Sequence, residues 1–211
     1  MTSTLCADDL RTPTRTSRCA HVTAVLRDGG TVALRPLVMG EIAPQLAVLE
    51  AMSDGSRFQR FLTGMPAQLP SAARAALSAI DGRRHVAWLA SIDGQPVGVA
   101  RYVELEPGLA EVAFEDVDAH HGRGIGSVLL EAVATVAMAQ GIRRFSATVH
   151  PGNAASIRLL RRVGLGLRAF DGLLEGTAEL RLPIPPGLDR AAILAAGLDR
   201  LPPQVSDRRS G

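Results

Sequence analysis

One stretch of the chain combines residue types at a spacing suited to holding an anion. Residues 110–117 have the composition of a β-strand, Gly122, Gly124 and Gly126 follow at every second position, and an apolar run typical of a helix begins at Ser127. Glycine lets the backbone adopt a positive φ or approach a ligand closely. A helix N-terminus offers unpaired N–H groups and the positive end of the helix dipole. Strand, glycine loop and helix together predict a phosphate or pyrophosphate site.

The spacing of these glycines excludes two common phosphate-binding motifs. A P-loop requires a Gly-Lys pair, and this sequence contains no lysine. The dinucleotide fingerprint G-x-G-x-x-G fails because Ser127 stands where the third glycine, counted from Gly122, is required. The motif that remains is His121-x-x-Gly124-x-Gly126. A glycine-rich strand-to-helix turn without a ligand is the simpler alternative, which the rest of the chain must decide.

Length and composition indicate one folded domain with two tails. The chain has 211 residues, of which 46% are hydrophobic and only 3% aromatic, so we expect a core of aliphatic side chains. We assign residues 1–20 to a disordered N-terminal tail, 21–184 to the domain, and 185–211 to a C-terminal helix and tail. A net charge of +2 gives no argument for a nucleic-acid partner.

The sequence also gives expectations about metals and cellular location. The two cysteines, Cys6 and Cys19, both lie in the N-terminal tail and have no metal-binding spacing, so we expect no metal and a reducing compartment. No apolar run approaches the ~20 residues that cross a bilayer, and the first ten residues do not resemble a secretory signal. We therefore expect a cytoplasmic protein that does not enter a membrane.

The pattern of apolar residues and turn signals predicts an α+β fold with one mixed sheet. We read the element order as β, α, α, β, β, β, α, β, α, β, β. Strands are expected over 22–25, 31–37, 85–91, 96–103, 108–117, 144–150, 167–170 and 177–182, and helices over 41–51, 53–62, 71–80, 127–140, 154–163 and 188–201. Residues 92–95 are expected to form a hairpin turn, and 183–186 a linker.

Three residues receive a specific structural interpretation. Phe58 and Phe61 are three positions apart and fall on one side of a helix, so we interpret both as core anchors. The alternative is that this helix forms a wall of a substrate site, with Arg57 and Arg60 at its rim. Ser71 is expected to cap the helix that follows Pro70.

With three motifs in register, the chain resembles the GNAT superfamily of acyl-CoA-dependent N-acyltransferases. The motifs are the strand 110–114, the loop His121-x-x-Gly124-x-Gly126, and the helix that runs from Asn153 to Gly164. The likeness covers roughly residues 31–182, and within the superfamily it points to the catalytic domain of bacterial Pat-type protein lysine acetyltransferases. It implies the GNAT fold, which is a single, mostly antiparallel mixed sheet flanked by helices, with two central strands that splay apart.

The resemblance implies acetyl-CoA as co-substrate, with its pantetheine between the splayed strands and its pyrophosphate on the glycine loop. His121 departs from the Arg or Gln usual at the first motif position, and Arg123 could add a charge-assisted contact to phosphate or simply be solvated. Asn153 is expected to cap its helix and also to contact the cofactor. The implied cofactor-binding residues are Phe114, Asp116, Val117, His121, Gly122, Arg123, Gly124, Ile125, Gly126, Ser127, Asn153 and Ser156.

The expected chemistry is attack of an amine on a thioester. Because an amine attacks only when neutral, a base must remove its proton, and Glu111 matches the strand glutamate that does so in protein-acetylating members. Its apolar neighbours are expected to desolvate it, and Glu115 is the second candidate. A backbone N–H near Phe114 or Glu115 could polarise the thioester oxygen. The position that holds a thiolate-protonating tyrosine in many relatives is Leu160 here.

The acceptor and the oligomeric state stay open at this point. Protein lysine is the first hypothesis, a small amine or amino-acid derivative the second, and a non-catalytic acyl-CoA-binding module the third. A DNA-binding function rests only on a basic helix face formed by Arg158, Arg161 and Arg162, which a solvated surface explains more simply. A homodimer is compatible with the sequence.

Overall fold

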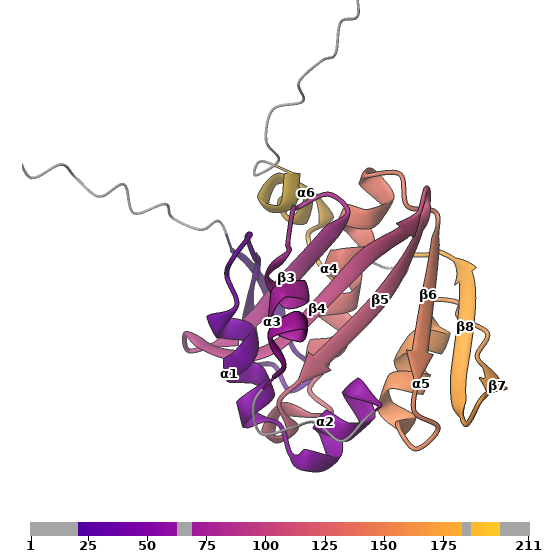
Figure 1. Cartoon of the computed structure of the whole chain (residues 1–211). Helices are drawn as coiled ribbons and strands as arrows, with labels where there is room; N and C mark the ends of the chain where they lie inside the picture. Colours follow the sequence, from indigo (N-terminus) through magenta and orange to yellow (C-terminus); the bar gives the residue numbers. More distant parts are fainter. Residues whose placement is uncertain (1–20, 63–68, 183–186, 199–211) are drawn as a thin grey trace, which may run out of the picture.

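The computed structural model describes residues 21–62, 69–182 and 187–198, which contain one eight-stranded sheet (Figure 1). The strand order is β1-β2-β3-β4-β5-β6-β8-β7, and only the β5–β6 pair is parallel. The sheet is therefore mixed and mostly antiparallel, as predicted. The strands are β1 (Val22–Val25), β2 (Thr31–Pro36), β3 (His85–Ile92), β4 (Gln95–Glu106), β5 (Leu109–Asp116), β6 (Arg144–Val149), β7 (Arg168–Phe170) and β8 (Leu173–Glu179).

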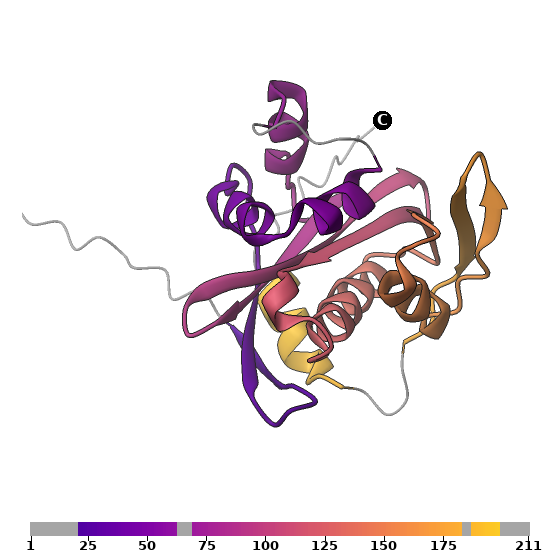
Figure 2. The ribbon, with the colours of Figure 1, turned by 90° about the horizontal axis from the view of Figure 1, so that it is seen from below.

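Helices cover both faces of this sheet, as Figure 2 shows from below. The described helices are α1 (Ala43–Ala51), α2 (Asp54–Phe61), α3 (Ser71–Ser78), α4 (Ile125–Ala139), α5 (Ala154–Arg162) and α6 (Arg190–Leu198), with a 3₁₀ turn, η1, over Asp118–His120. Helices α1–α3 lie on one face, and α4–α6 lie on the other. The two strands and three helices before β3 match the residue ranges expected from the sequence, although the abbreviated element order counted only one strand and two helices there.

The long helix α4 forms the centre of the core, because nearly every side chain from Ile125 to Ala137 is buried. Its single charged residue, Glu131, is also buried and accepts hydrogen bonds from the backbone N of Gly187 (3.0 Å) and Nε of Arg190 (3.0 Å). These bonds hold the C-terminal helix α6 against α4. The expected helix 188–201 begins at Arg190, and its last residues lie outside the described part of the chain.

Two local predictions were wrong and one was confirmed. Phe58 is 45% exposed and packs edge-on against His150, so it is not a core anchor. The cap of α3 is Pro70, and Ser71 is already helical. The hairpin between β3 and β4 turns through Asp93 (φ 50°) and Gly94 (φ 78°), consistent with the two-residue turn that the sequence predicted.

Several expectations fall on residues that are not described: the tail 1–20 with both cysteines, and the linker 183–186. Among the described helices, none is long and apolar enough to cross a bilayer. Within the same residues, no group of three or more His, Cys, Asp or Glu side chains could hold a metal ion.

Candidate active site

The central cleft arises because β5 and β6 pair over only three residues. Leu109, Ala110 and Glu111 pair with Arg144, Phe145 and Ser146, and beyond that point the two strands diverge (Figure 1). The opening is a cleft of about 720 Å³, lined by residues 112–116 on one side and 147–149 on the other. The splayed central strands expected from the resemblance are therefore present.

The glycine loop at the base of the cleft presents a row of unpaired backbone donors. Gly122 and Gly124 have φ of 80° and 102°, values that favour glycine, and α4 begins at the next residue, Ile125. The N–H groups of residues 122–126 make no hydrogen bond to any described residue. Five unpaired donors at a helix N-terminus have the geometry expected of an anion site, so the predicted phosphate contact is compatible with the structure.

Asn153 begins the helix on the opposite wall of the cleft. Its Oδ1 accepts a hydrogen bond from the backbone N of Ser156 (3.0 Å), which confirms the predicted capping role. Both residues line the cleft, so their predicted cofactor contact is compatible with the cap.

Ten of the twelve predicted cofactor-binding residues line the cleft, and two do not. The ten are Phe114, Asp116, His121, Gly122, Gly124, Ile125, Gly126, Ser127, Asn153 and Ser156. Val117 is buried in the core, and its N–H donates to the carbonyl of Val97 (2.9 Å). The Arg123 Nε donates to Oδ2 of Asp28 (2.5 Å), so this arginine is turned toward the β1–β2 hairpin.

Glu111 lies where the cleft meets a second, shallower groove of about 370 Å³, and it lines both. The groove is lined by Leu105, Glu111, Ser146, Ala147, Thr148, Glu175, Gly176 and Thr177. The expectation that apolar neighbours desolvate Glu111 was wrong, because Ala110 and Val112 point to the opposite, buried face of the strand. Glu111 is an exposed carboxylate at the mouth of the cleft.

Glu115, the second candidate base, is engaged in a buried ion-pair network. Its oxygens accept hydrogen bonds from Nε of Arg60 (2.7 Å) and from Nη2 of Arg101 (2.5 Å), and Arg101 also donates to Gln45 (2.9 Å). Burial works to raise the pKa of Glu115, but the charges and hydrogen bonds of the two arginines hold that pKa below its usual range. A carboxylate held in its ionised form by two arginines is a poor proton acceptor, which argues against Glu115 as the base.

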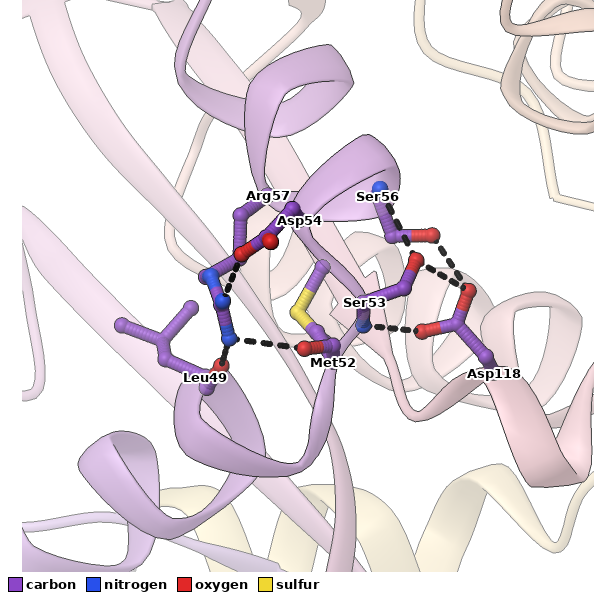
Figure 3. Close-up of polar contacts among 7 residues, drawn as sticks. All are labelled: Leu49, Met52, Ser53, Asp54, Ser56, Arg57 and Asp118. Atoms are coloured by element: carbon purple, nitrogen blue, oxygen red, sulfur yellow. Dashed lines mark hydrogen bonds and ion pairs between the residues drawn. The ribbon is translucent and has the colours of Figure 1, made fainter. Parts of the chain in front are cut away.

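The wall contributed by α2 was only partly anticipated. Arg60 and Phe61 line the cleft, consistent with the alternative that this helix forms a wall of a substrate site. Arg57 instead bonds locally, to the carbonyls of Leu49 (3.2 Å) and Met52 (2.7 Å) and to Asp54 (Figure 3). The Arg60–Glu115 pair joins residues 55 positions apart, which no local pattern reveals.

Asp118 fixes α2 to the turn that precedes the glycine loop. It accepts hydrogen bonds from the backbone N and Oγ of Ser53 (2.7 and 2.9 Å) and from Oγ of Ser56 (2.6 Å), as Figure 3 shows. Burial works to raise its pKa, but these hydrogen bonds lower the pKa to about 2. The substrate wall and the anion loop are thus linked by one carboxylate.

Of the two backbone N–H groups considered as donors to the thioester oxygen, that of Phe114 faces the cleft and that of Glu115 does not. The Val117 N–H points toward β4, because it donates to the carbonyl of Val97, which is a residue of β4. Successive N–H groups of a strand alternate in direction, so the Glu115 N–H also points to β4 and the Phe114 N–H points to the side from which β6 has withdrawn. Phe114 lines the cleft.

The chain's one tyrosine is remote from this chemistry. Tyr102 is fully buried, and its hydroxyl is hydrogen-bonded to the carbonyl of Arg83 (3.2 Å) and to Oε1 of Gln140 (3.1 Å). Burial raises its pKa above the usual value. Leu160, at the position expected for a tyrosine, lines the cleft but is itself 2% exposed. A thiolate formed in this cleft must obtain its proton elsewhere.

A mixed sheet whose central strands diverge beside an anion-binding glycine loop defines a class of acyl-CoA-dependent acyltransferases. The profile of the Acetyltransferase (GNAT) family matches residues 55–165, more than half of the chain. The chain therefore belongs to this family of N-acetyltransferases. The crystal structure of the GNAT domain of S. lividans PAT is similar to it, with 33% sequence identity, a TM-score of 0.69, and coverage of 76% of this chain and 97% of that domain.

Two curated relatives and one further structure extend the comparison. Acetyltransferase Pat of Mycolicibacterium smegmatis is 31% identical over 144 residues, which are 66% of this chain and 42% of that protein. The L-methionine sulfoximine/L-methionine sulfone acetyltransferase of Pseudomonas aeruginosa is 38% identical over 76 residues, which are 34% of this chain and 44% of that protein. The chain thus spans less than half the length of either relative. Salmonella typhimurium yncA, solved with acetyl-CoA, shares the fold at 18% identity and a TM-score of 0.54, over 74% of this chain and 97% of that one.

The described residues fit the acetyl-CoA that this family uses. The five unpaired N–H groups of residues 122–126 match a pyrophosphate. The unpaired side of β5 over residues 112–116 offers backbone groups to the amides of pantetheine. Pyrophosphate and pantetheine would thus lie along one continuous cleft.

Proposed function

We propose that this chain transfers the acetyl group of acetyl-CoA to the side-chain amine of protein lysine. The observation that carries the proposal is the position of Glu111, an exposed carboxylate that lines both the cofactor cleft and the open groove. A base placed at that junction can serve an amine that enters from the groove while the acyl donor occupies the cleft.

In this mechanism, Glu111 and the Phe114 N–H have different roles. A lysine amine has a pKa of ~10.4 and is mostly protonated near neutrality, so the Glu111 carboxylate accepts its proton directly or through water. Acetyl-CoA supplies an activated acyl group as a thioester. The Phe114 N–H donates a hydrogen bond to the oxygen on which negative charge develops. Solvent that enters the open end of the cleft supplies a proton to the departing CoA thiolate.

The groove supports a cationic acceptor in particular. Ser146 pairs with Glu111 on one side and with Thr177 on the other, so these side chains share one face of the sheet. Glu175, paired with Thr148, lies on the same face and lines the same groove, so the groove contains a second carboxylate. Two carboxylates in a shallow groove favour a lysine side chain presented by a protein. The resemblance to Pat-type lysine acetyltransferases supports the same acceptor.

One observation favours a small amino-acid acceptor as the second candidate. Arg60 lines the cleft and uses its Nε for Glu115, while its guanidinium lies 5.0 Å from the ring centre of Phe61. The remaining nitrogens suit an α-carboxylate, which a bidentate arginine recognises well. The similarity to an acetyltransferase of L-methionine sulfoximine agrees with this alternative.

The test is to supply the purified chain with radiolabelled acetyl-CoA and either a lysine-rich protein mixture or a set of free amino acids. Label in protein supports the proposal, and label only in small molecules supports the second candidate. Glu111→Gln is expected to lower the transfer rate by about 100- to 10,000-fold, the usual contribution of a general base. Glu50→Gln, on the exposed side of α1, is the matched control and is expected to retain the wild-type rate.

The outcome that refutes the enzyme proposal is equally defined. If the wild type binds CoA but transfers no label into either fraction, a non-catalytic acyl-CoA-binding module becomes the better description. If Glu111→Gln transfers label at the wild-type rate, Glu111 is not the base. The cytoplasmic location expected from the sequence stays a prediction.

A further inference from the structure

The turn between β1 and β2 is docked on the glycine loop, although the two are separated by about 95 residues of sequence. The backbone N of Arg27 donates to the carbonyl of Arg123 (3.0 Å), and Nε of Arg123 donates to Asp28 (2.5 Å). The turn is closed by its own bonds, from the N of Leu26 to the carbonyl of Gly30 (2.7 Å) and from the N of Gly30 to Asp28 (3.1 Å). The hairpin therefore holds a fixed position beside the anion site.

Arg27 extends from this turn across the loop. A methyl group built on Gly124 would lie 3.4 Å from Cγ and 3.5 Å from Nε of Arg27, so the arginine side chain packs directly against the loop backbone. Arg27 lines the same cleft as Gly122 and Gly124. Within the described part of the chain, only the backbone of Arg27 is hydrogen-bonded, and its guanidinium makes no ion pair or hydrogen bond.

The cations that the sequence suggested for this site are already engaged. Arg123 is paired with Asp28, and the Nε2 of His121 lies 3.2 Å from the carbonyl oxygen and 3.5 Å from Oδ1 of Asp116. Both side chains thus already have a carboxylate beside them. Arg27, from outside the motif, packs against the glycine loop and has no carboxylate partner among the described residues, whereas Arg158 and Arg162, which also line the cleft, come from α5 on its opposite wall.

We propose that Arg27 binds the pyrophosphate of coenzyme A, supplying the charge that the first position of the glycine motif does not provide here. The inference rests on the proposed use of acetyl-CoA and adds a binding residue that lies outside the family motif. Phosphate recognition suits arginine, because its planar guanidinium can donate two parallel hydrogen bonds to phosphate oxygens. The 3′-phosphate of the ribose is the other phosphate group of the same ligand, and the test separates the two.

The experiment is isothermal titration calorimetry of the full chain and its Arg27→Gln variant with CoA and with 3′-dephospho-CoA. A charge-assisted hydrogen bond corresponds to about a 10- to 100-fold loss of affinity when it is removed. We expect that loss for both ligands, since both contain the pyrophosphate, and a weaker dependence of Kd on salt in the variant. Arg27→Lys should recover part of the affinity, and Arg168→Gln, an exposed arginine on β7, should bind like the wild type.

The outcomes distinguish failure of this inference from failure of the proposed function. If the wild type binds CoA and Arg27→Gln binds it within about twofold, Arg27 has no role in phosphate binding. If the variant loses affinity for CoA but not for 3′-dephospho-CoA, the contact is to the 3′-phosphate and the pyrophosphate assignment is wrong. If the wild type binds neither ligand, the proposed acetyl-CoA function itself fails. A thermal melt of each variant confirms that it is folded.

Discussion

Replacing Glu115 by glutamine tests whether the two glutamates of β5 have different roles, Glu115 a structural one and Glu111 a chemical one. The substitution keeps the shape of the side chain but removes the counter-charge of Arg101, whose side chain is 6% exposed, and of Arg60. Breaking a buried ion pair by removing one partner costs about 3–5 kcal/mol, because the other charge is left uncompensated. Within the described residues, Arg101 already has an Nε without a hydrogen-bond partner, so this network cannot absorb a further loss.

This loss of stability is large enough to measure as a shift in melting temperature. For a domain of this size, 1 kcal/mol corresponds to about 2–4 °C, so we expect Glu115→Gln to melt roughly 6–20 °C below the wild type. Glu111→Gln removes an exposed carboxylate and should change stability by no more than about 0.5 kcal/mol. Differential scanning fluorimetry at pH 7 on both variants gives the comparison directly.

A double variant tests the reason for the loss. If uncompensated charge is responsible, Arg101→Met combined with Glu115→Leu should recover much of the stability, since a buried ion pair can be replaced by apolar residues at little cost. A Glu115→Gln protein that melts within about 2 °C of the wild type would refute the reasoning, because that shift corresponds to at most about 1 kcal/mol. Recovery of melting temperature with activity still lost would instead give the network a positioning role for α2.

Three further predictions concern other parts of the site. Asp118→Asn should lower the free energy of unfolding at pH 7 by about 1 kcal/mol after allowance for solvent screening. Because the folded pKa of about 2 lies below the ordinary 3.8, the difference from wild type is fully present above pH 4 and should close as the pH falls toward 2. Unfolding curves measured at a series of acid pH values test this. Tyr102→Phe should cost about 1 kcal/mol in chemical denaturation and leave kcat unchanged, and a large loss of kcat would show that this hydroxyl takes part in catalysis. Gly124→Ala places a Cβ on a residue with φ of 102° and should lower the free energy of unfolding by about 1–2 kcal/mol and weaken CoA binding. Thermal melting and calorimetry measure the two effects, and an unchanged melting temperature and Kd would show that the loop relaxes.

The features predicted correctly from the sequence are those that depend on a few adjacent residues. The glycine spacing identified the anion loop, and Asn153 identified the start of α5, because capping and positive φ depend on a few adjacent residues. The side on which a side chain is buried depends on distant elements, which explains the error at Phe58. The partners of Arg123 and Glu115 likewise lie far away in the sequence, 95 residues for Asp28 and 55 for Arg60, so no local pattern could predict that both side chains are engaged in ion pairs.

The divergence of β5 from β6 also creates two edges in the middle of a sheet. Residues 112–116 are paired only with β4, and residues 147–149 only with β8, so each strand presents a free row of backbone groups to the cleft. Such rows are the usual templates for pairing between molecules and hence for aggregation, which proteins normally prevent by covering or charging them. We expect the ligand-free protein to aggregate faster on mild heating than the CoA-bound protein. A ligand that fills this gap would then act, in addition to its chemical role, as the missing strand that keeps the protein monodisperse.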